Sequence, residues 1–115
     1  LRLLIVEEDS NTPVGVIDLY EVSQRHLRAF IGIYICKGQR CKGYAEEAIR
    51  LVAGYAHNTL HLHQLGAKIE KGHPISEKLF TDLGFTCRGR LEEWLSTPDG
   101  KYSDMLLFTK LLKAE

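Results

Sequence analysis

Apolar runs separated by turn residues make up the first third of the chain. Residues 1–8 and 14–22 are apolar stretches on either side of a polar segment that contains Pro13, which predicts two strands joined as a hairpin. Residues 29–36 are apolar on both faces, as is typical of a strand with neighbours on each side. We therefore predict three strands here, with the third in the centre of the sheet.

From residue 43 onward, the apolar positions follow a helical period. They form one stripe of an amphipathic helix: Ala45, Ala48, Ile49, Val52, Tyr55 and Ala56. Residues 65–70 predict a short strand, after which Pro74 begins a second helix that stops at Gly84. The predicted inner face of this second helix is Ile75, Leu79, Phe80 and Leu83.

Two more strands complete the pattern. Residues 85–94 and 101–112 flank a Pro-Asp-Gly sequence, which is a strong turn signal. The order is strand, strand, strand, helix, strand, helix, strand, strand. We predict a mixed α/β (α+β) fold in which helices flank a mostly antiparallel central sheet.

The composition is typical of one globular domain, which we assign to residues 1–115, with 44% hydrophobic and 26% charged residues. A net charge of zero argues against a protein dedicated to nucleic acid or membrane surfaces. No apolar run approaches the roughly 18 residues that span a bilayer. Three cysteines without a CxxC pair favour reduced thiols in a cytoplasmic protein. His57 and His61 are spaced like metal ligands, but no carboxylate or cysteine signature accompanies them, so we predict no metal site.

A cationic, glycine-bearing turn lies between the third strand and the first helix. A helix that begins after such a turn leaves several backbone N–H groups unpaired, and with the helix dipole they form an anion site. Lys37, Arg40 and Lys42 add positive charge, while Gly43 and Ala45 keep large side chains away. We interpret the turn as a phosphate site; a solvated basic loop before an ordinary helix is the alternative.

The same turn carries a family motif. Residues 40–45 (RCKGYA) resemble the [QR]-x-x-G-x-[GA] signature of the GNAT N-acetyltransferases. Residues 79–85 (LFTDLGF) resemble the LYEKLGF segment of that family, and residues 99–104 (DGKYSD) resemble its DGxYxD turn. Residues 17–20 and 28–29 resemble the branch that holds ribosomal-protein and spermidine N-acetyltransferases. The resemblance covers essentially the whole chain in family order.

The resemblance implies the GNAT fold and transfer of an acetyl group from acetyl-coenzyme A to a primary amine. That amine is a protein N-terminus, a polyamine or a small molecule. In this family the central strand and the next strand splay apart around the pantetheine arm, and the turn holds the pyrophosphate. No metal is implied. The implied cofactor-binding positions are Ile33, Tyr34, Ile35, Arg40, Cys41, Lys42, Gly43, Tyr44, Ala45, His73, Ser76 and Phe80.

Four positions depart from the family pattern. His73 stands where relatives usually carry asparagine, and Cys41 stands where glycine is frequent. Phe80 replaces the tyrosine that protonates the departing thiolate in many relatives, and Phe30 replaces a glutamate that some use as a base. A non-catalytic acyl-coenzyme A-binding or assembly module of the same fold is therefore the alternative to an enzyme.

Asp18 and Tyr34 are the candidates for a substitute base. A carboxylate or phenol near the thioester could relay the proton of the amine through water. The alternatives are that Asp18 makes a structural hydrogen bond and that Tyr34 only packs.

The resemblance also predicts what the chain lacks. The family fold normally begins with a strand and one or two helices before the first strand found here, so we expect the C-terminal two-thirds of that fold. In the family those elements form a wall of the amine site, so the residues present here do not predict which amine is acetylated. An exposed sheet edge near Leu1 would favour pairing with another chain, so a homodimer is possible. A domain that folds by dimerising and binds no cofactor is a third alternative.

Overall fold

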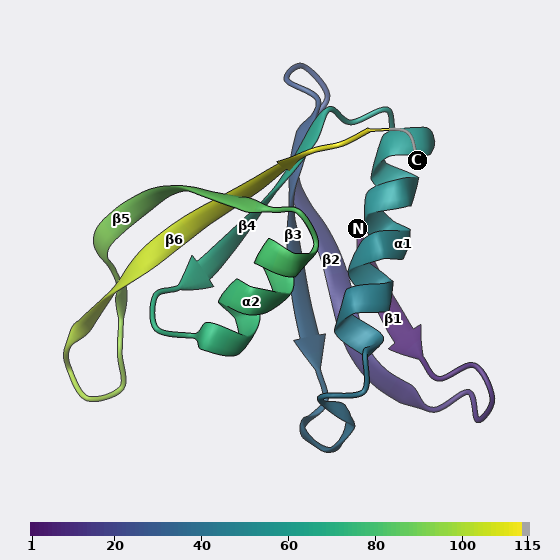
Figure 1. Cartoon of the computed structure of the whole chain (residues 1–115), viewed down its shortest axis with the longest axis horizontal. Coiled ribbons are helices and arrows are strands. Elements are labelled where there is room, and N and C mark those ends of the chain that lie inside the picture. The colour runs from purple at the N-terminus through teal and green to yellow at the C-terminus, as the bar shows by residue number, and fades with distance from the viewer. Residues whose placement is uncertain (114–115) are drawn as a thin grey trace.

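The computed structural model describes residues 1–113 and confirms the predicted fold class. Six strands form one sheet in the order β1-β2-β3-β4-β6-β5, and only the β3–β4 pair is parallel (Figure 1). The strands are β1 (Arg2–Val6), β2 (Pro13–Ser23), β3 (Arg28–Ile35), β4 (Gln64–Glu70), β5 (Thr86–Ser96) and β6 (Tyr102–Leu111). The helices are α1 (Tyr44–Asn58) and α2 (Pro74–Asp82), and η1 (Lys37–Gln39) is a short 3₁₀ turn.

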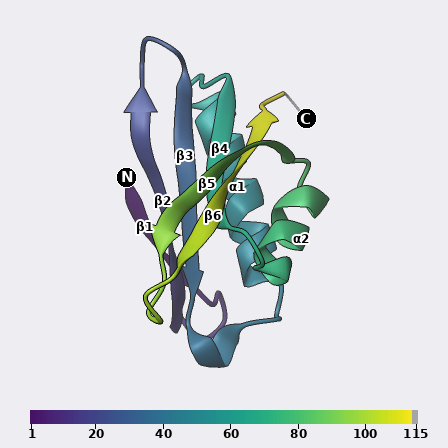
Figure 2. The ribbon, with the colours of Figure 1, turned by 90° about the vertical axis from the view of Figure 1, so that its left-hand side faces the viewer.

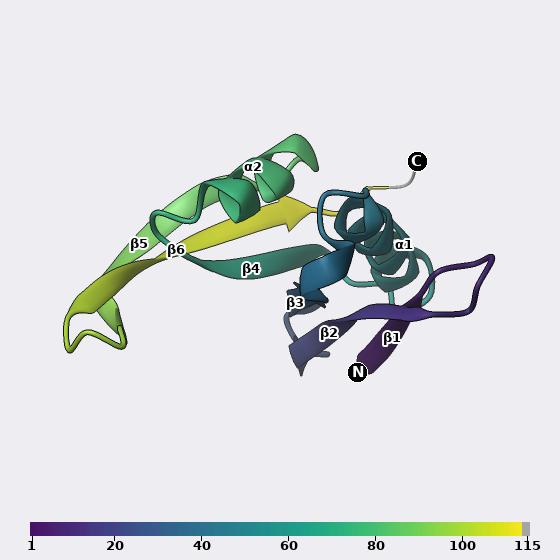
Figure 3. The same ribbon diagram turned by 90° about the horizontal axis from the view of Figure 1, so that it is seen from below.

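Both helices cover the same face of the sheet (Figures 2 and 3). Side chains alternate between the two faces of a strand, so every second residue of β2 and β3 points toward the helices. Ile17 lies opposite Ile33, and Leu19 lies opposite Ile31, on this inner face. They pack with the α1 stripe in one hydrophobic core. As predicted, β3 lies inside the sheet.

The prediction that Tyr55 and Ile75 face the core was wrong. The Tyr55 residue of α1 is 41% exposed, and the Ile75 residue of α2 is 72% exposed. Each lies at the margin of its stripe because a helix turns about 100° per residue. The centres of the stripes are buried as expected, with Ile49 in α1 and Phe80 in α2.

The strands β3 and β4 pair at their beginning and then diverge. Their register joins Arg28 to Gln64, Ala29 to Leu65, and Phe30 to Gly66, and no later pair forms within residues 1–113. Figure 1 shows the two arrows pointing away from each other beyond this point. The expected splay of the central strands is therefore present.

The last β3–β4 pair depends on a glycine. A Cβ atom at Gly66 would lie 2.7 Å from the Phe30 ring, so the ring rests directly on the glycine backbone. The Nζ atom of Lys68 lies 4.4 Å from the centroid of the same ring, and the Tyr20 ring stacks on it at 5.7 Å. Phe30 therefore packs at the point where the strands part.

Candidate functional site

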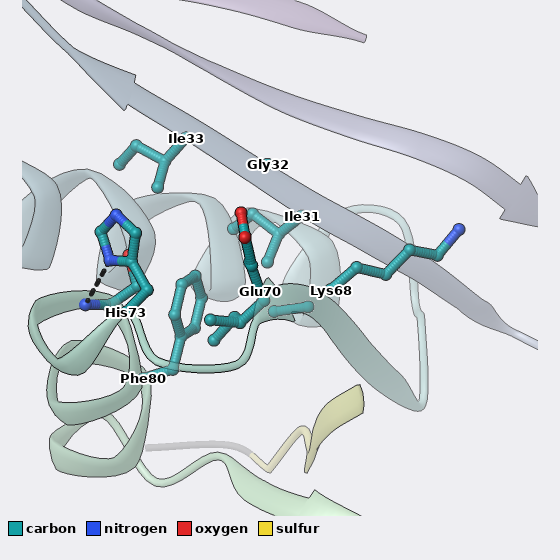
Figure 4. Close-up of a pocket in the computed structure, with 10 residues that line it drawn as sticks. Ile31, Gly32, Ile33, Lys68, Glu70, His73 and Phe80 are labelled. Carbon is teal, nitrogen blue, oxygen red and sulfur yellow. Dashed lines mark hydrogen bonds between the residues drawn. The ribbon is translucent and has the colours of Figure 1, made fainter. Parts of the chain in front are cut away.

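A cavity of about 150 Å³ occupies the gap between β3 and β4 (Figure 4). Its residues come from β3, β4 and α2: Ile31, Gly32, Ile33, Ala67, Lys68, Ile69, Glu70, His73, Ser76 and Phe80. The cavity is smaller than the roughly 300–1,000 Å³ of pockets that enclose a drug-sized ligand. It therefore suits the reacting end of a long ligand better than the whole of one.

The cavity brings together four of the predicted cofactor-binding residues, which are Ile33, His73, Ser76 and Phe80. The predicted site residues did not include the remaining members of the cavity, which are Ile31, Gly32 and residues 67–70. The alternation of side chains along each strand, combined with the expected divergence of the two central strands, could have identified these residues. Once β3 and β4 part, every residue that borders the gap on either strand becomes a candidate.

His73 caps α2 at the floor of the cavity. Its Nδ1 atom accepts a hydrogen bond from the backbone N–H of Ser76 at 3.4 Å (Figure 4). In a neutral imidazole, an accepting Nδ1 places the proton on Nε2. His73 can therefore fix the helix start with one nitrogen and donate to a ligand with the other.

Phe80 gives the cavity an apolar wall. Its side chain is buried, and its ring meets the Phe85 ring edge-on at a centroid distance of 5.0 Å. It has no hydroxyl group, so this position supplies no proton to a leaving group. It lines the cavity with carbon atoms only.

The glycine-bearing turn contains two residues with a left-handed backbone just before α1. Gly43 has a left-handed φ of 82°, and Cys41 adopts a φ of 63°. No side chain caps the start of α1. The N–H groups of Tyr44 to Glu46 have no hydrogen-bond partner among residues 1–113. The start of α1 therefore presents free donors next to a backbone without a Cβ at Gly43.

The cations of this turn are held close to the end of β3. The Nε atom of Arg40 donates to the carbonyl oxygen of Ile35 at 3.1 Å, and its guanidinium lies 5.6 Å from the centroid of the Tyr34 ring. The Nζ atom of Lys42 donates to the Gln39 side chain at 3.1 Å. Both side chains remain exposed, so their charge is available to a ligand at the turn.

The two candidate bases lie outside the cavity. The Asp18 carboxylate accepts two hydrogen bonds from the Arg2 guanidinium, at 2.8 and 3.0 Å. The hydrogen bond from Arg2 holds the pKa of Asp18 below its usual value, which weakens it as a base. The Tyr34 side chain is 53% exposed and lies under Arg40 rather than in the gap.

Residues 1–113 contain neither a metal-ligand cluster nor a membrane-spanning helix. Within this range, no three His, Cys, Asp or Glu side chains lie close enough to hold a metal ion. Neither of the helices described here is long and apolar enough to cross a bilayer. The three cysteines, Cys36, Cys41 and Cys87, are free and exposed.

Comparison with known families identifies this arrangement. The family model described as the acetyltransferase (GNAT) domain matches residues 1–86. The chain belongs to the GNAT acetyltransferase family. The matched residues run from β1 through the turn and α2, and they include the cavity between β3 and β4. The GNAT resemblance expected from the motif is confirmed.

Curated relatives of this GNAT chain are bacterial. It is 29% identical over 114 residues to the uncharacterized N-acetyltransferase p20 of Bacillus licheniformis. This alignment covers 99% of this chain and 63% of the relative. It is 27% identical to the spermidine N(1)-acetyltransferase of Vibrio cholerae, over 90% of this chain and 60% of that enzyme. The chain therefore spans about 60% of the length of these two relatives.

Solved structures confirm the GNAT fold. A dodecameric spermidine N-acetyltransferase from Vibrio cholerae, in an intermediate state, aligns with a TM-score of 0.91 and 24% sequence identity. The alignment covers 96% of this chain and 64% of that one. A chimeric form of the Vibrio enzyme aligns with a TM-score of 0.92.

Proposed function

We propose that this chain carries the acetyl-coenzyme A site of an N-acetyltransferase that acetylates a primary amine. We also propose that residues 1–115 form a single GNAT-like domain, equivalent to the C-terminal two-thirds of the usual fold. The observation that carries the proposal is the divergence of β3 and β4 beside a cationic turn with an open helix start. The family membership of the chain supports the same conclusion.

In the proposed complex, the cofactor lies along the open edge of β3. Past Phe30, β3 has no partner on the β4 side, so backbone groups of residues 31–35 face the gap. An extended pantetheine arm can pair with such groups as a strand would. We assign this role to Ile33, Tyr34 and Ile35, and we place the thioester in the cavity beside His73, Ser76 and Phe80.

The pyrophosphate would then lie at the turn. Free N–H groups at a helix start favour an anion through hydrogen bonds and through the helix dipole. We assign the pyrophosphate contacts to residues 40–45: Arg40, Cys41, Lys42, Gly43, Tyr44 and Ala45. A Cβ atom at Gly43 would meet no atom within 4 Å, so the space beside this backbone is open.

The proposed reaction begins with attack of a neutral amine on the thioester carbonyl. A backbone N–H group stabilises the oxyanion, and coenzyme A leaves as a thiolate. A thiol has a pKa of about 8.5, so the thiolate is a tolerable leaving group even beside Phe80. The acceptor is a protein N-terminus, a polyamine or a small-molecule amine. The name of the Vibrio cholerae relative makes spermidine the first amine to test.

Calorimetric titration tests the cofactor site. We expect acetyl-coenzyme A to bind at micromolar strength, and acetyl-pantetheine, which lacks the pyrophosphate, to bind far more weakly. The double substitution Arg40→Ala with Lys42→Ala should weaken binding of acetyl-coenzyme A at least tenfold, or about 1.4 kcal/mol. Arg25→Ala with Arg88→Ala removes the same charge elsewhere and should leave the affinity unchanged. Equal affinity of all three proteins would contradict the assignment of the turn.

A non-catalytic acyl-coenzyme A-binding or assembly module is the second candidate. Phe80 favours it, because the apolar wall offers no acid for the leaving group. An amine panel separates the candidates. Acetyl transfer above a blank without protein supports the enzyme, whereas tight cofactor binding without transfer to any amine supports the module.

We also propose that the chain forms a homodimer along the free edge of β1. This strand ends the sheet order, and Leu4 is 61% exposed on it. Unpaired strand edges readily pair with another chain. Sedimentation should show a dimer that Leu4→Lys dissociates, and a monomer at all concentrations would contradict the proposal.

A further inference from the structure

The cavity holds a carboxylate that sequence reasoning did not single out. Glu70 is the last residue of β4, and its carboxylate points across the cavity toward β3 near Gly32 (Figure 4). The backbone of Glu70 pairs with Met105 of β6, whereas its carboxylate makes no hydrogen bond or ion pair with any other group of residues 1–113. The carboxylate is exposed, so a ligand can reach it.

Other carboxylates near the gap already have partners. Asp18 binds Arg2, Glu21 binds Lys68, Glu77 accepts from the Gly72 N–H, and Asp104 accepts from the Glu93 N–H. Glu70 therefore differs from these carboxylates because it lines the cavity and its carboxylate has no partner within residues 1–113. The few polar side chains that line a cavity are candidates for orienting a ligand in it.

Strand parity places Glu70 on the face of the sheet that the helices leave open. Gly66 pairs with Phe30, so Lys68 and Glu70 share the face of Gly32, away from the helices. Gly32 has no side chain to block approach from that face. The Nζ atom of Lys68 is turned aside, 3.3 Å from Glu21 and over the Phe30 ring. A cation that enters from this face therefore meets the Glu70 carboxylate first.

We propose that Glu70 is the catalytic carboxylate that binds the substrate amine and carries its proton to the coenzyme A thiolate. The proposal rests on the proposed acetyltransferase function and deepens it. It assigns one group to both proton transfers, at a site where Phe30 and Phe80 can perform neither. The preferred substrate is a primary amine that is cationic in solution.

The proton balance of the reaction follows from this role. The ammonium group loses one proton to solvent and becomes a neutral amine, whose lone pair forms the nitrogen–carbon bond with the thioester carbonyl. The nitrogen of the tetrahedral intermediate then gives a second proton to the Glu70 carboxylate. As the carbon–sulfur bond breaks, the thiolate leaves and takes that proton from Glu70. The products are the amide and coenzyme A, and Glu70 is again a carboxylate.

The test compares Glu70→Gln with Glu92→Gln, which removes an exposed carboxylate of β5 outside the cavity. The probes are spermidine and a short alanyl peptide with acetyl-coenzyme A. We expect kcat of Glu70→Gln to fall roughly 100-fold, as is typical for loss of a general base. The KM for the amine should rise, and the calorimetric affinity for acetyl-coenzyme A should stay within about twofold. Glu92→Gln should behave as the wild-type protein does.

A pH series separates a chemical role from a structural one. The loss in Glu70→Gln should narrow between pH 7 and pH 9.5, because hydroxide can take the second proton from the tetrahedral intermediate in place of the carboxylate as pH rises. Glu70→Asp should restore part of the rate. The charged or titratable groups around Glu70 in this pH series are Lys68, Lys71, His73, Glu77 and Asp104, and Asp18 lies on the far side of β3.

Each other outcome overturns the proposal. Wild-type rates in Glu70→Gln would remove Glu70 from the chemistry while the acetyltransferase function stands. A loss of acetyl-coenzyme A binding in Glu70→Gln would assign the residue to the cofactor site instead. A wild-type protein that binds the cofactor but acetylates neither probe would overturn both the role of Glu70 and the enzymatic proposal.

Discussion

Backbone conformation at single residues determines what the turn before α1 can bind. Gly43 has a φ of 82° and an open space where a Cβ atom would stand, whereas Gly54 lies inside α1 without a positive φ. The two glycines therefore have different structural roles. Gly43 permits a left-handed backbone beside the proposed pyrophosphate site, whereas Gly54 only weakens a helix.

Alanine substitutions should separate these two roles. We expect Gly43→Ala to lower the free energy of unfolding by about 1–2 kcal/mol, because a Cβ disfavours the left-handed region. It should also weaken acetyl-coenzyme A binding, since the new methyl group enters the proposed pyrophosphate space. Gly54→Ala should raise the free energy of unfolding by about 0.5–1 kcal/mol. Urea denaturation and calorimetry measure both; unchanged affinity in Gly43→Ala would contradict the placement of the pyrophosphate.

The sequence allowed the turn to be predicted but not the position of the Glu70 carboxylate in the cavity. Residues 40–45 form a contiguous motif, so the chemistry of the turn is visible in the chain itself. Glu70 borders the cavity only because β4 leaves β3 after Phe30, and that divergence depends on contacts between distant segments. Asp18 was chosen from its place in a strand, whereas its partner Arg2 belongs to a different strand.

At the scale of elements, the departure of β4 from β3 is the main structural device. The Phe30 ring rests on the backbone of Gly66 at the last paired position. This contact closes the paired end of the two strands and leaves the other end free to open. The aromatic side chain at position 30 therefore contributes to the shape of the site although it performs no chemistry.

A methyl group at position 66 should disturb this junction. We expect Gly66→Ala to lower the free energy of unfolding by about 1–3 kcal/mol, because its Cβ would overlap the Phe30 ring. The double variant Gly66→Ala with Phe30→Ala should lose less than the sum of the two single variants, since the clash disappears. Additive losses in urea denaturation would show that the ring and the glycine do not interact.

A hydrogen bond also ties the β1–β2 turn to the start of α1. The Tyr44 hydroxyl donates to the Glu7 carboxylate at 2.5 Å, and Ser10 donates to the same carboxylate. The bond from Tyr44, and then that from Ser10, lowers the pKa of Glu7. A carboxylate whose pKa is lower in the folded state stabilises the fold at pH values above its pKa in the unfolded state. This stabilisation disappears as the pH falls through its pKa in the folded state.

Removal of this bond should change the acid sensitivity of the fold. Tyr44→Phe should be less stable than the wild-type protein at pH 7, and the gap should shrink toward pH 3, as Glu7 becomes protonated in both proteins. Urea denaturation at the two pH values measures the gap, with Tyr102→Phe, which alters an exposed tyrosine of β6, as the control. A gap that is equal at both pH values would show that Glu7 is not involved.

The order of strands and helices followed from the sequence, while the margins of the elements did not. Period-two and period-3.6 patterns are local, so all six strands and both helices were predicted near their observed positions. Periodicity gives the centre of a stripe but not its width. Tyr55 and Ile75 were therefore assigned to the core, although both side chains reach solvent.

Across the whole molecule, the two faces of the sheet have different tasks. The helices cover one face and close the core, while the other face leaves the gap between β3 and β4 open beside Gly32 and Glu70 (Figures 2 and 4). Under the proposed function, the cofactor would reach the cavity along the turn before α1, and the amine would reach it from the face that carries Gly32 and Glu70.

The most direct test of this account is an NMR titration of the labelled chain with acetyl-coenzyme A. We expect backbone amide shifts to cluster in two segments, residues 31–35 on the open edge of β3 and residues 41–46 at the turn. Acetyl-pantetheine should shift only the first segment. Shifts confined to other parts of the sheet, or none in a folded sample, would contradict a cofactor site between β3 and β4.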